Sequence, residues 1–167
     1  NGYSNVILTQ KAISDKTETT KLYLCKYSNG MHRIYQSEIC EGHVEIESSK
    51  LDDFFESVKF NGNIDFIKID TEGSEVKVIR GIKNIINMNK DVKILVEFEP
   101  GSIVQSGCSP KELLTQIENH GFKIIPVESK KILKIVSTEE LSKRFNEKNL
   151  NYVNLFCSKE ENLVNLE

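Results

Sequence analysis

The sequence contains no tryptophan, only three prolines, and four cysteines that form no Cys-x-x-Cys pair. No stretch approaches the roughly 20 apolar residues that a membrane-spanning helix needs, and the first residues lack the basic and apolar pattern of a signal peptide. The net charge of −3 creates no basic field that would attract nucleic acid or an anionic membrane. We therefore expect neither nucleic acid nor a membrane as a partner.

Several kinds of site are also absent. The chain has no Gly-x-Gly-x-x-Gly or Gly-x-x-x-x-Gly-Lys-Ser/Thr loop for nucleotides, and Ser74 lacks the Gly-x-Ser-x-Gly context of a hydrolase nucleophile. The three histidines are not clustered with the cysteines, so no metal site is assigned. Scattered cysteines are typical of a reducing compartment, which predicts a cytoplasmic protein.

The length of 167 residues corresponds to one domain with a buried core. The polar turn at residues 1–5 leads directly into the apolar run Val6–Leu8, as a loop between a helix and a strand would. We expect residues 1–167 to be a single, incomplete domain that belongs to a longer chain.

Alternating and apolar runs predict several short strands before residue 50. The expected strands are Val6–Ile13, Lys21–Lys26, Arg33–Gln36 and His43–Ser48. Turn signals between the last three indicate a small antiparallel insert over residues 20–48. A short helix is expected at Leu51–Val58, with Ser49 as its N-cap.

From residue 64 onward, strands and helices alternate. A buried strand Ile64–Asp70 precedes a helix Ser74–Met88 and a second apolar strand Val92–Phe98. Capping-box patterns open helices at Ser109 and Ser137, and the first is expected to end at Gly121. The remaining expected strands are Phe122–Val127, Ile132–Val136 and Asn151–Cys157. This alternation predicts an α/β fold with right-handed βαβ units and a mostly parallel sheet.

Acidic residues follow two of these strands. Asp70 and Glu72 come after the first, and Glu97 and Glu99 end the second. Because the carboxyl ends of parallel strands meet at one edge of a sheet, we expect these side chains to lie close together. Such a cluster can take a proton from a hydroxyl, hold a divalent cation or hydrogen-bond a polar ligand, and mutual repulsion raises the pKa of at least one member.

The same acids have a structural interpretation. Acidic side chains near a helix N-terminus stabilise its dipole, a role that both Glu72 and Glu75 fit. We expect Glu75 and Glu99 to be structural and favour a functional role for Asp70, while Glu97 fits either role. Gly73 is expected to allow the sharp turn between strand and helix.

The segment Ile64–Gly73, with Glu75, Arg80-Gly81 and Ile94–Glu97, resembles the core signature of FkbM-type methyltransferases. The opening residues 1–8 and 11–15 are similar to the stretch that precedes this signature in the family. The resemblance covers most of the chain from Asn1 to Gly121.

This resemblance implies a class I, Rossmann-like fold and methyl transfer from S-adenosylmethionine to an oxygen, on a sugar, polyketide, similar small molecule or glycan. Asp70 and Glu72 match the acidic pair that faces the methyl-transfer cleft, and with Glu97 they are the predicted catalytic residues. Ala12 and Ile13 match the loop that borders the adenine and are the predicted cofactor-binding residues.

The chain departs from the family pattern in one respect. The family's glycine-rich loop and its ribose-binding acid are expected upstream of Asn1, so we expect these 167 residues alone to bind the cofactor weakly or not at all. Without the neighbouring strands, the edges of Val6–Ile13 and Ile64–Asp70 are expected to be exposed. Exposed edges pair with other chains, which predicts a homodimer through this edge.

Two other functions remain open from the sequence. The chain can be a non-catalytic remnant or interaction module with the same fold. It can also be a metal-dependent enzyme, such as a phosphotransfer domain, that uses the acid cluster. The insert at residues 20–48 is the predicted source of the acceptor pocket, because such pockets are commonly built from variable loops.

Overall fold

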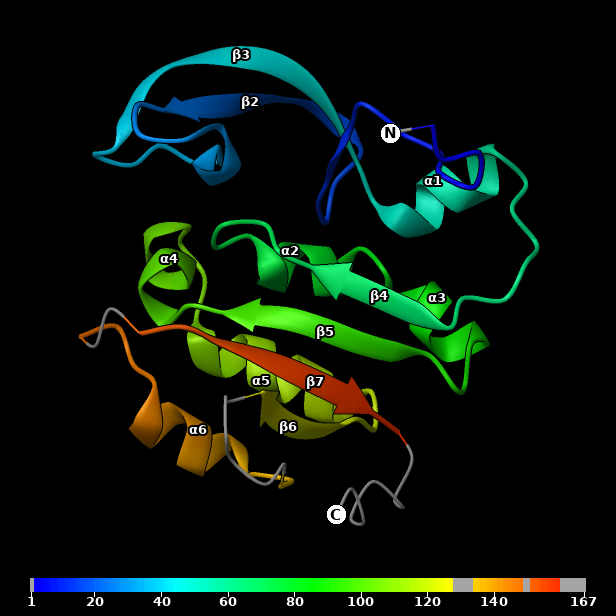
Figure 1. The fold of residues 1–167 in the computed structure, drawn as a ribbon, viewed down its shortest axis with the longest axis vertical. Helices are drawn as coiled ribbons and strands as arrows, with labels where there is room; N and C mark the ends of the chain where they lie inside the picture. The colour runs from blue at the N-terminus through cyan, green and yellow to red at the C-terminus, as the bar shows by residue number, and fades with distance from the viewer. Residues whose placement is uncertain (1, 128–133, 149–150, 160–167) are drawn as a thin grey trace.

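A computed structural model describes residues 2–127, 134–148 and 151–159 of the chain. The described strands form two sheets (Figure 1). The smaller has the order β1-β3-β2, with β1 at Ala12–Ile13, β2 at Glu18–Cys25 and β3 at Cys40–Ser49. The larger has the order β4-β5-β7-β6, with β4 at Phe66–Ile69, β5 at Lys93–Phe98, β6 at Lys123–Val127 and β7 at Val153–Ser158.

Short helices connect and cover these strands. They are η1 (Asn29–Met31), α1 (Leu51–Ser57), α2 (Glu75–Arg80), α3 (Lys83–Met88), α4 (Pro100–Gln105), α5 (Pro110–Asn119) and α6 (Thr138–Arg144). In the view of Figure 1, α2 and α5 lie behind the larger sheet, and β2 and β3 run across the top, beyond its β4 edge. None of the helices in the described part of the chain is long and apolar enough to cross a bilayer.

Both sheets are mixed. In the larger sheet, β4 and β5 are the only described neighbouring strands that pair in parallel. The other two pairs, β5–β7 and β6–β7, are antiparallel. In the smaller one β1 is parallel and β2 antiparallel to β3. The α/β class agrees with a methyltransferase-like fold, but the expected predominance of parallel pairing is not confirmed. The reason is that β7, the last strand described, inserts between β5 and β6 in the opposite direction.

The core lies where β5 and its neighbours meet the helices behind them. Side chains of β5 alternate between buried and half-buried, with Ile94, Val96 and Phe98 inaccessible to solvent. The predicted helical face formed by Val76, Ile79, Ile82 and Ile86 is fully buried, as the periodicity indicated. This packing holds the carboxyl ends of β4 and β5 rigidly beside each other.

The helix predicted at Ser74–Met88 is in fact two helices, α2 and α3, separated at Gly81 and Ile82. Distant parts of the chain contact this break, because a Cβ atom on Gly81 would lie 2.1 Å from the carbonyl oxygen of Ser14 and the Gly81 carbonyl accepts a hydrogen bond from the Asp52 N–H. The carboxylate of Asp52 then accepts hydrogen bonds from the backbone N–H groups of Asn84 and Ile85 and so caps α3.

Two of the predicted strands before residue 50 are largely wrong. Of the strand Val6–Ile13, only Ala12 and Ile13 pair with a neighbour, and Ile7 and Leu8 are exposed. The segment Arg33–Gln36 makes a single bridge, between Tyr23 and Arg33, and otherwise passes as a loop toward α2. In both segments the residue types favour a strand, but a strand also requires a hydrogen-bonded partner along its length.

The remaining boundaries agree more closely. The N-cap of α1 is Lys50 instead of Ser49, and the Ser109 side chain makes no capping bond, whereas Ser137 accepts one from the Glu140 N–H. Gly121 follows the C-cap of α5 with φ of +83°, as expected of a glycine there. The sequence did not predict α4. The predicted strand Ile132–Val136 lies partly outside the described residues, and its described part is not a strand.

Candidate functional site

Three of the predicted site residues come together at the carboxyl ends of β4 and β5. Because Ile69 pairs with Val96 in parallel register, Asp70, which follows β4, lies beside Glu97, the last residue but one of β5. The turn after β4 adds Glu72. One carboxylate oxygen from each of these three residues lies within 4.8 Å of the other two, and we refer to them as the acid triad.

Two members of the acid triad have a cation beside them. The Lys68 ammonium donates a hydrogen bond to the Asp70 carboxylate, which raises the pKa of Lys68. The Arg33 guanidinium lies 3.4 Å from the Glu72 carboxylate. Glu97 has no ion-pair partner among the described residues. Within the described part of the chain, Glu97 thus has two carboxylates nearby and no ion pair to offset their charge.

This placement determines where the triad binds a proton. Burial, followed by the negative charges of Asp70 and Glu72, raises the pKa of Glu97 to about 7. Burial also raises the pKa of Glu72, while the charge of Arg33 opposes that rise. Glu97 consequently exchanges a proton near neutral pH, which is what a general base for a hydroxyl group requires.

The turn between β4 and α2 holds Glu72 in place. Both Glu72, with φ of +54°, and Gly73, with φ of +101°, have left-handed backbone conformations. A Cβ atom on Gly73 would lie 2.4 Å from the carbonyl oxygen of Ser102, so only glycine fits there. The prediction that Gly73 allows a sharp turn between strand and helix is therefore confirmed.

Glu75 organises this turn from inside. It is 1% exposed, and its Oε1 accepts hydrogen bonds from Thr71 N, Thr71 Oγ1 and Gly73 N at 3.0, 3.0 and 3.1 Å. Burial raises the pKa of this carboxyl group. Glu75 is structural, as expected, but it acts by tying the turn together and not as an exposed charge at the helix end.

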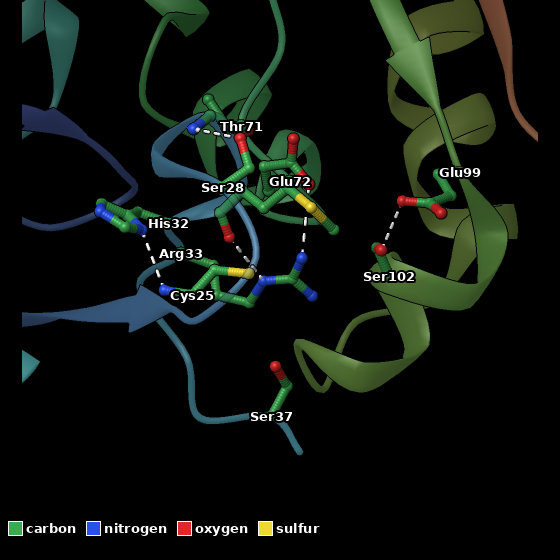
Figure 2. A network of polar contacts seen from close by, with 12 residues as sticks. Cys25, Ser28, His32, Arg33, Ser37, Thr71, Glu72, Glu99 and Ser102 are labelled. Carbon is green, nitrogen blue, oxygen red and sulfur yellow. Dashed lines mark hydrogen bonds and ion pairs between the residues drawn. The ribbon is translucent and has the colours of Figure 1, made fainter. Parts of the chain in front are cut away.

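Other residues of the site did not emerge from the sequence (Figure 2). Arg33 and Tyr35, from the connection between β2 and β3, contact Glu72, and Ser102 of α4 donates a hydrogen bond to Glu99. Arg33 and Glu72 are 39 positions apart, a separation at which a single sequence carries no signal of contact. The sequence shows only an arginine at the start of a weak strand pattern, and its burial becomes visible in the structure.

The predicted cofactor-binding residues lie elsewhere in the described structure. Ala12 and Ile13 form β1 and pair with Ser48 and Ser49 of β3, and Ile13 packs against the main core. None of the contacts described for them reaches the acid triad. Their role toward the adenine stays a prediction.

The acid triad suits several chemical tasks. It can accept a proton from a hydroxyl group, and its negative charge favours a cation such as the sulfonium of S-adenosylmethionine. The residues present thus fit the reactive end of that cofactor. Three carboxylates this close are also compact enough for a divalent cation, but acidic groups commonly gather without one, so this geometry alone assigns no metal.

Comparison with known protein families gives one match. The model of the family described as Methyltransferase FkbM domain matches residues 6–124, which include β4, β5 and all three members of the acid triad. Searches of curated proteins and of solved structures found no match.

Proposed function

Because the chain belongs to the FkbM methyltransferase family, we propose that it forms the acceptor side of a site that methylates an oxygen. The methyl donor is S-adenosylmethionine, and the acceptor is a hydroxyl group of a small molecule or glycan. The observation that carries this proposal is the acid triad, whose member Glu97 lies near two carboxylates and forms no ion pair with the described residues.

The three acids have different tasks in this proposal. S-Adenosylmethionine, when bound, supplies an electrophilic methyl group on a positively charged sulfur. Glu97 accepts the proton that the acceptor hydroxyl loses as its oxygen becomes a nucleophile. Asp70 and Glu72, which lie against Lys68 and Arg33, orient the hydroxyl and favour positive charge in the cleft.

The β2–β3 unit is the proposed wall of the acceptor site. Its connecting segment reaches the acid triad through Arg33, so changes in this insert alter what lies beside the reacting hydroxyl. This agrees with the general tendency of specificity to reside in loops on a constant scaffold.

Calorimetric titration tests the choice of cofactor. S-Adenosylmethionine and its demethylated product, S-adenosylhomocysteine, are titrated into the 167-residue chain and into the complete product of its gene. We expect the complete gene product to bind both compounds. If neither protein binds either compound, the methyltransferase proposal is wrong, and a non-catalytic interaction module of the same fold takes its place.

A further inference from the structure

The connection between β2 and β3 makes two polar contacts with Glu72, and a third hydrogen bond joins the two residues that make them. Arg33 Nη2 lies 3.4 Å from Glu72 Oε2, and Arg33 Nη1 donates to the Tyr35 hydroxyl at 3.1 Å. The Tyr35 hydroxyl in turn donates to the main-chain carbonyl of Glu72 at 2.7 Å. One acid of the triad is thus held at its side chain and at its backbone by two residues of the same loop.

The burial of Arg33 makes these contacts specific. Arg33 is 4% exposed, although the guanidinium is among the groups that cost most to remove from water. Its remaining described donor, Nε, binds the carbonyl oxygen of Met31. A buried cation that donates from each of its three nitrogens keeps its orientation, since rotation breaks one or more of these bonds.

Tyr35 also contacts the turn between β4 and α2, at Glu72 and Gly73. A Cβ atom on Gly73 would lie 2.7 Å from the Tyr35 hydroxyl, so this hydroxyl occupies the space that the missing side chain leaves. Tyr35 is 8% exposed, and burial raises the pKa of its hydroxyl, which stays protonated and able to donate. The left-handed conformation of Glu72 is therefore supported by a contact that a phenyl ring alone cannot make.

We propose that Arg33 and Tyr35 are positioning residues for the acid triad, which fix the carboxylate and the carbonyl of Glu72 against the ends of β4 and β5. The arrangement makes the β2–β3 unit part of the site and not an appendage. The use of the triad in methyl transfer rests on the proposed function, whereas the positioning itself is measurable without cofactor or acceptor.

The test follows the carboxyl carbons of Glu72 and Glu97 by NMR in 13C-labelled protein, with assignments from Glu72→Gln and Glu97→Gln. Arg33→Met removes the guanidinium and keeps an unbranched apolar side chain, and Arg33→Lys restores the charge. Tyr35→Phe removes only the hydroxyl. Arg144→Met is the matched control, because Arg144 forms an ion pair with Glu140 on α6, away from the β2–β3 connection.

We expect Arg33→Met to raise the titration midpoint of Glu72 by about one pH unit, since an adjacent opposite charge lowers a carboxyl pKa by roughly 1–3 units. Arg33→Lys should recover at least half of this shift. Tyr35→Phe should speed hydrogen exchange of the Gly73 amide by about fivefold or more, because the turn loses its support. The control should change neither quantity.

The proposal is overturned if Arg33→Met is folded and both carboxyl groups titrate as in the unmodified protein. A purely structural role would lower the free energy of unfolding and leave those midpoints in the folded state unchanged. If Arg33→Met does not fold, Arg33→Lys and Tyr35→Phe decide, and an unchanged Gly73 exchange rate in both rejects the proposal. Because no measurement involves S-adenosylmethionine, a negative result here is distinct from failure of the methyltransferase proposal.

Discussion

The three carboxylates of the acid triad differ in their immediate neighbours. Asp70 contacts Lys68 and Glu72 contacts Arg33, while Glu97 has no ion-pair partner among the described residues. The raised pKa of Glu97 follows from burial beside two negative charges. A group that is costly to ionise in the folded protein destabilises the fold whenever it is ionised, so this residue links the site to stability.

This link predicts that Glu97→Gln stabilises the protein at alkaline pH. Between the ordinary carboxyl pKa of 4.5 and the raised value of about 7, the folded state binds more protons at Glu97 than the unfolded chain does. The free energy of unfolding therefore falls as the pH rises through this window. Because glutamine cannot ionise, Glu97→Gln does not lose this part of its free energy of unfolding as the pH rises. We expect Glu97→Gln to be more stable by about 1–2 kcal/mol at pH ~8, after allowance for solvent screening, and about equally stable at pH ~4.

Urea unfolding at both pH values measures this difference. Glu118→Gln serves as the control, because Glu118 is exposed on α5 and should show no such dependence on pH. Equal stabilities of Glu97→Gln and the unmodified protein at pH ~8 would show that Glu97 ionises without cost.

At the scale of elements, the turn from β4 to α2 is the part of the fold on which the site depends. It brings Glu72 back toward the strand ends through two successive left-handed residues. Glu75 ties it from within, and Tyr35 and Ser102 close it from outside. Small changes in this turn should therefore cost more than similar changes elsewhere.

Gly73→Ala tests this dependence. Alanine at this position pays the cost of a left-handed backbone, roughly 1–2 kcal/mol, and also collides with Ser102 and Tyr35, so we expect a total loss of about 3 kcal/mol or more. Gly107→Ala is a matched control, since Gly107 also has a positive φ, of +82°, but has no atom within 4 Å of an added Cβ. Losses of equal size at the two positions, measured by denaturant unfolding, would contradict a closely packed turn.

The same elements show what the sequence could predict. The strands β4 and β5 and the acids at their ends follow from apolar runs that end in carboxylates, which is information local to each strand. The expected burial of β4 is wrong for most of the strand, because of its four residues only Ile69 is buried. The break at Gly81 and the contacts of Arg33 depend on Ser14 and Glu72, which are distant in the sequence. Periodicity reports which side of an element faces the core. It does not report which distant group will contact a given side chain.

At the scale of the whole molecule, the two edge strands of the larger sheet differ in how well they are protected from pairing with another chain. At one edge of the larger sheet, β6 contains Pro126, which cannot donate a hydrogen bond to a further strand. At the opposite edge, β4 has no proline, and its Phe66 is 51% exposed. The β4 edge is thus the one that can accept another chain.

We propose that the 167-residue chain forms a homodimer through the β4 edge. Phe66→Lys should make the chain monomeric, because a lysine on an edge strand opposes pairing with a second copy. Val127→Lys, at the β6 edge, should leave the dimer intact. Sedimentation equilibrium over a range of concentrations measures both, and a monomeric mass for the unmodified chain throughout that range would refute the dimer.

The central claim is that the acid triad removes the proton during methyl transfer, and methyl labelling tests it most directly. The full-length gene product is incubated with methyl-labelled S-adenosylmethionine and an extract of hydroxylated metabolites and glycans from its source. We expect label in an acceptor, a rate that rises with pH through about 7, and a roughly 100-fold or greater loss in Glu97→Gln with little change in Glu118→Gln. Transfer of label by folded Glu97→Gln at the unmodified rate would contradict the claim.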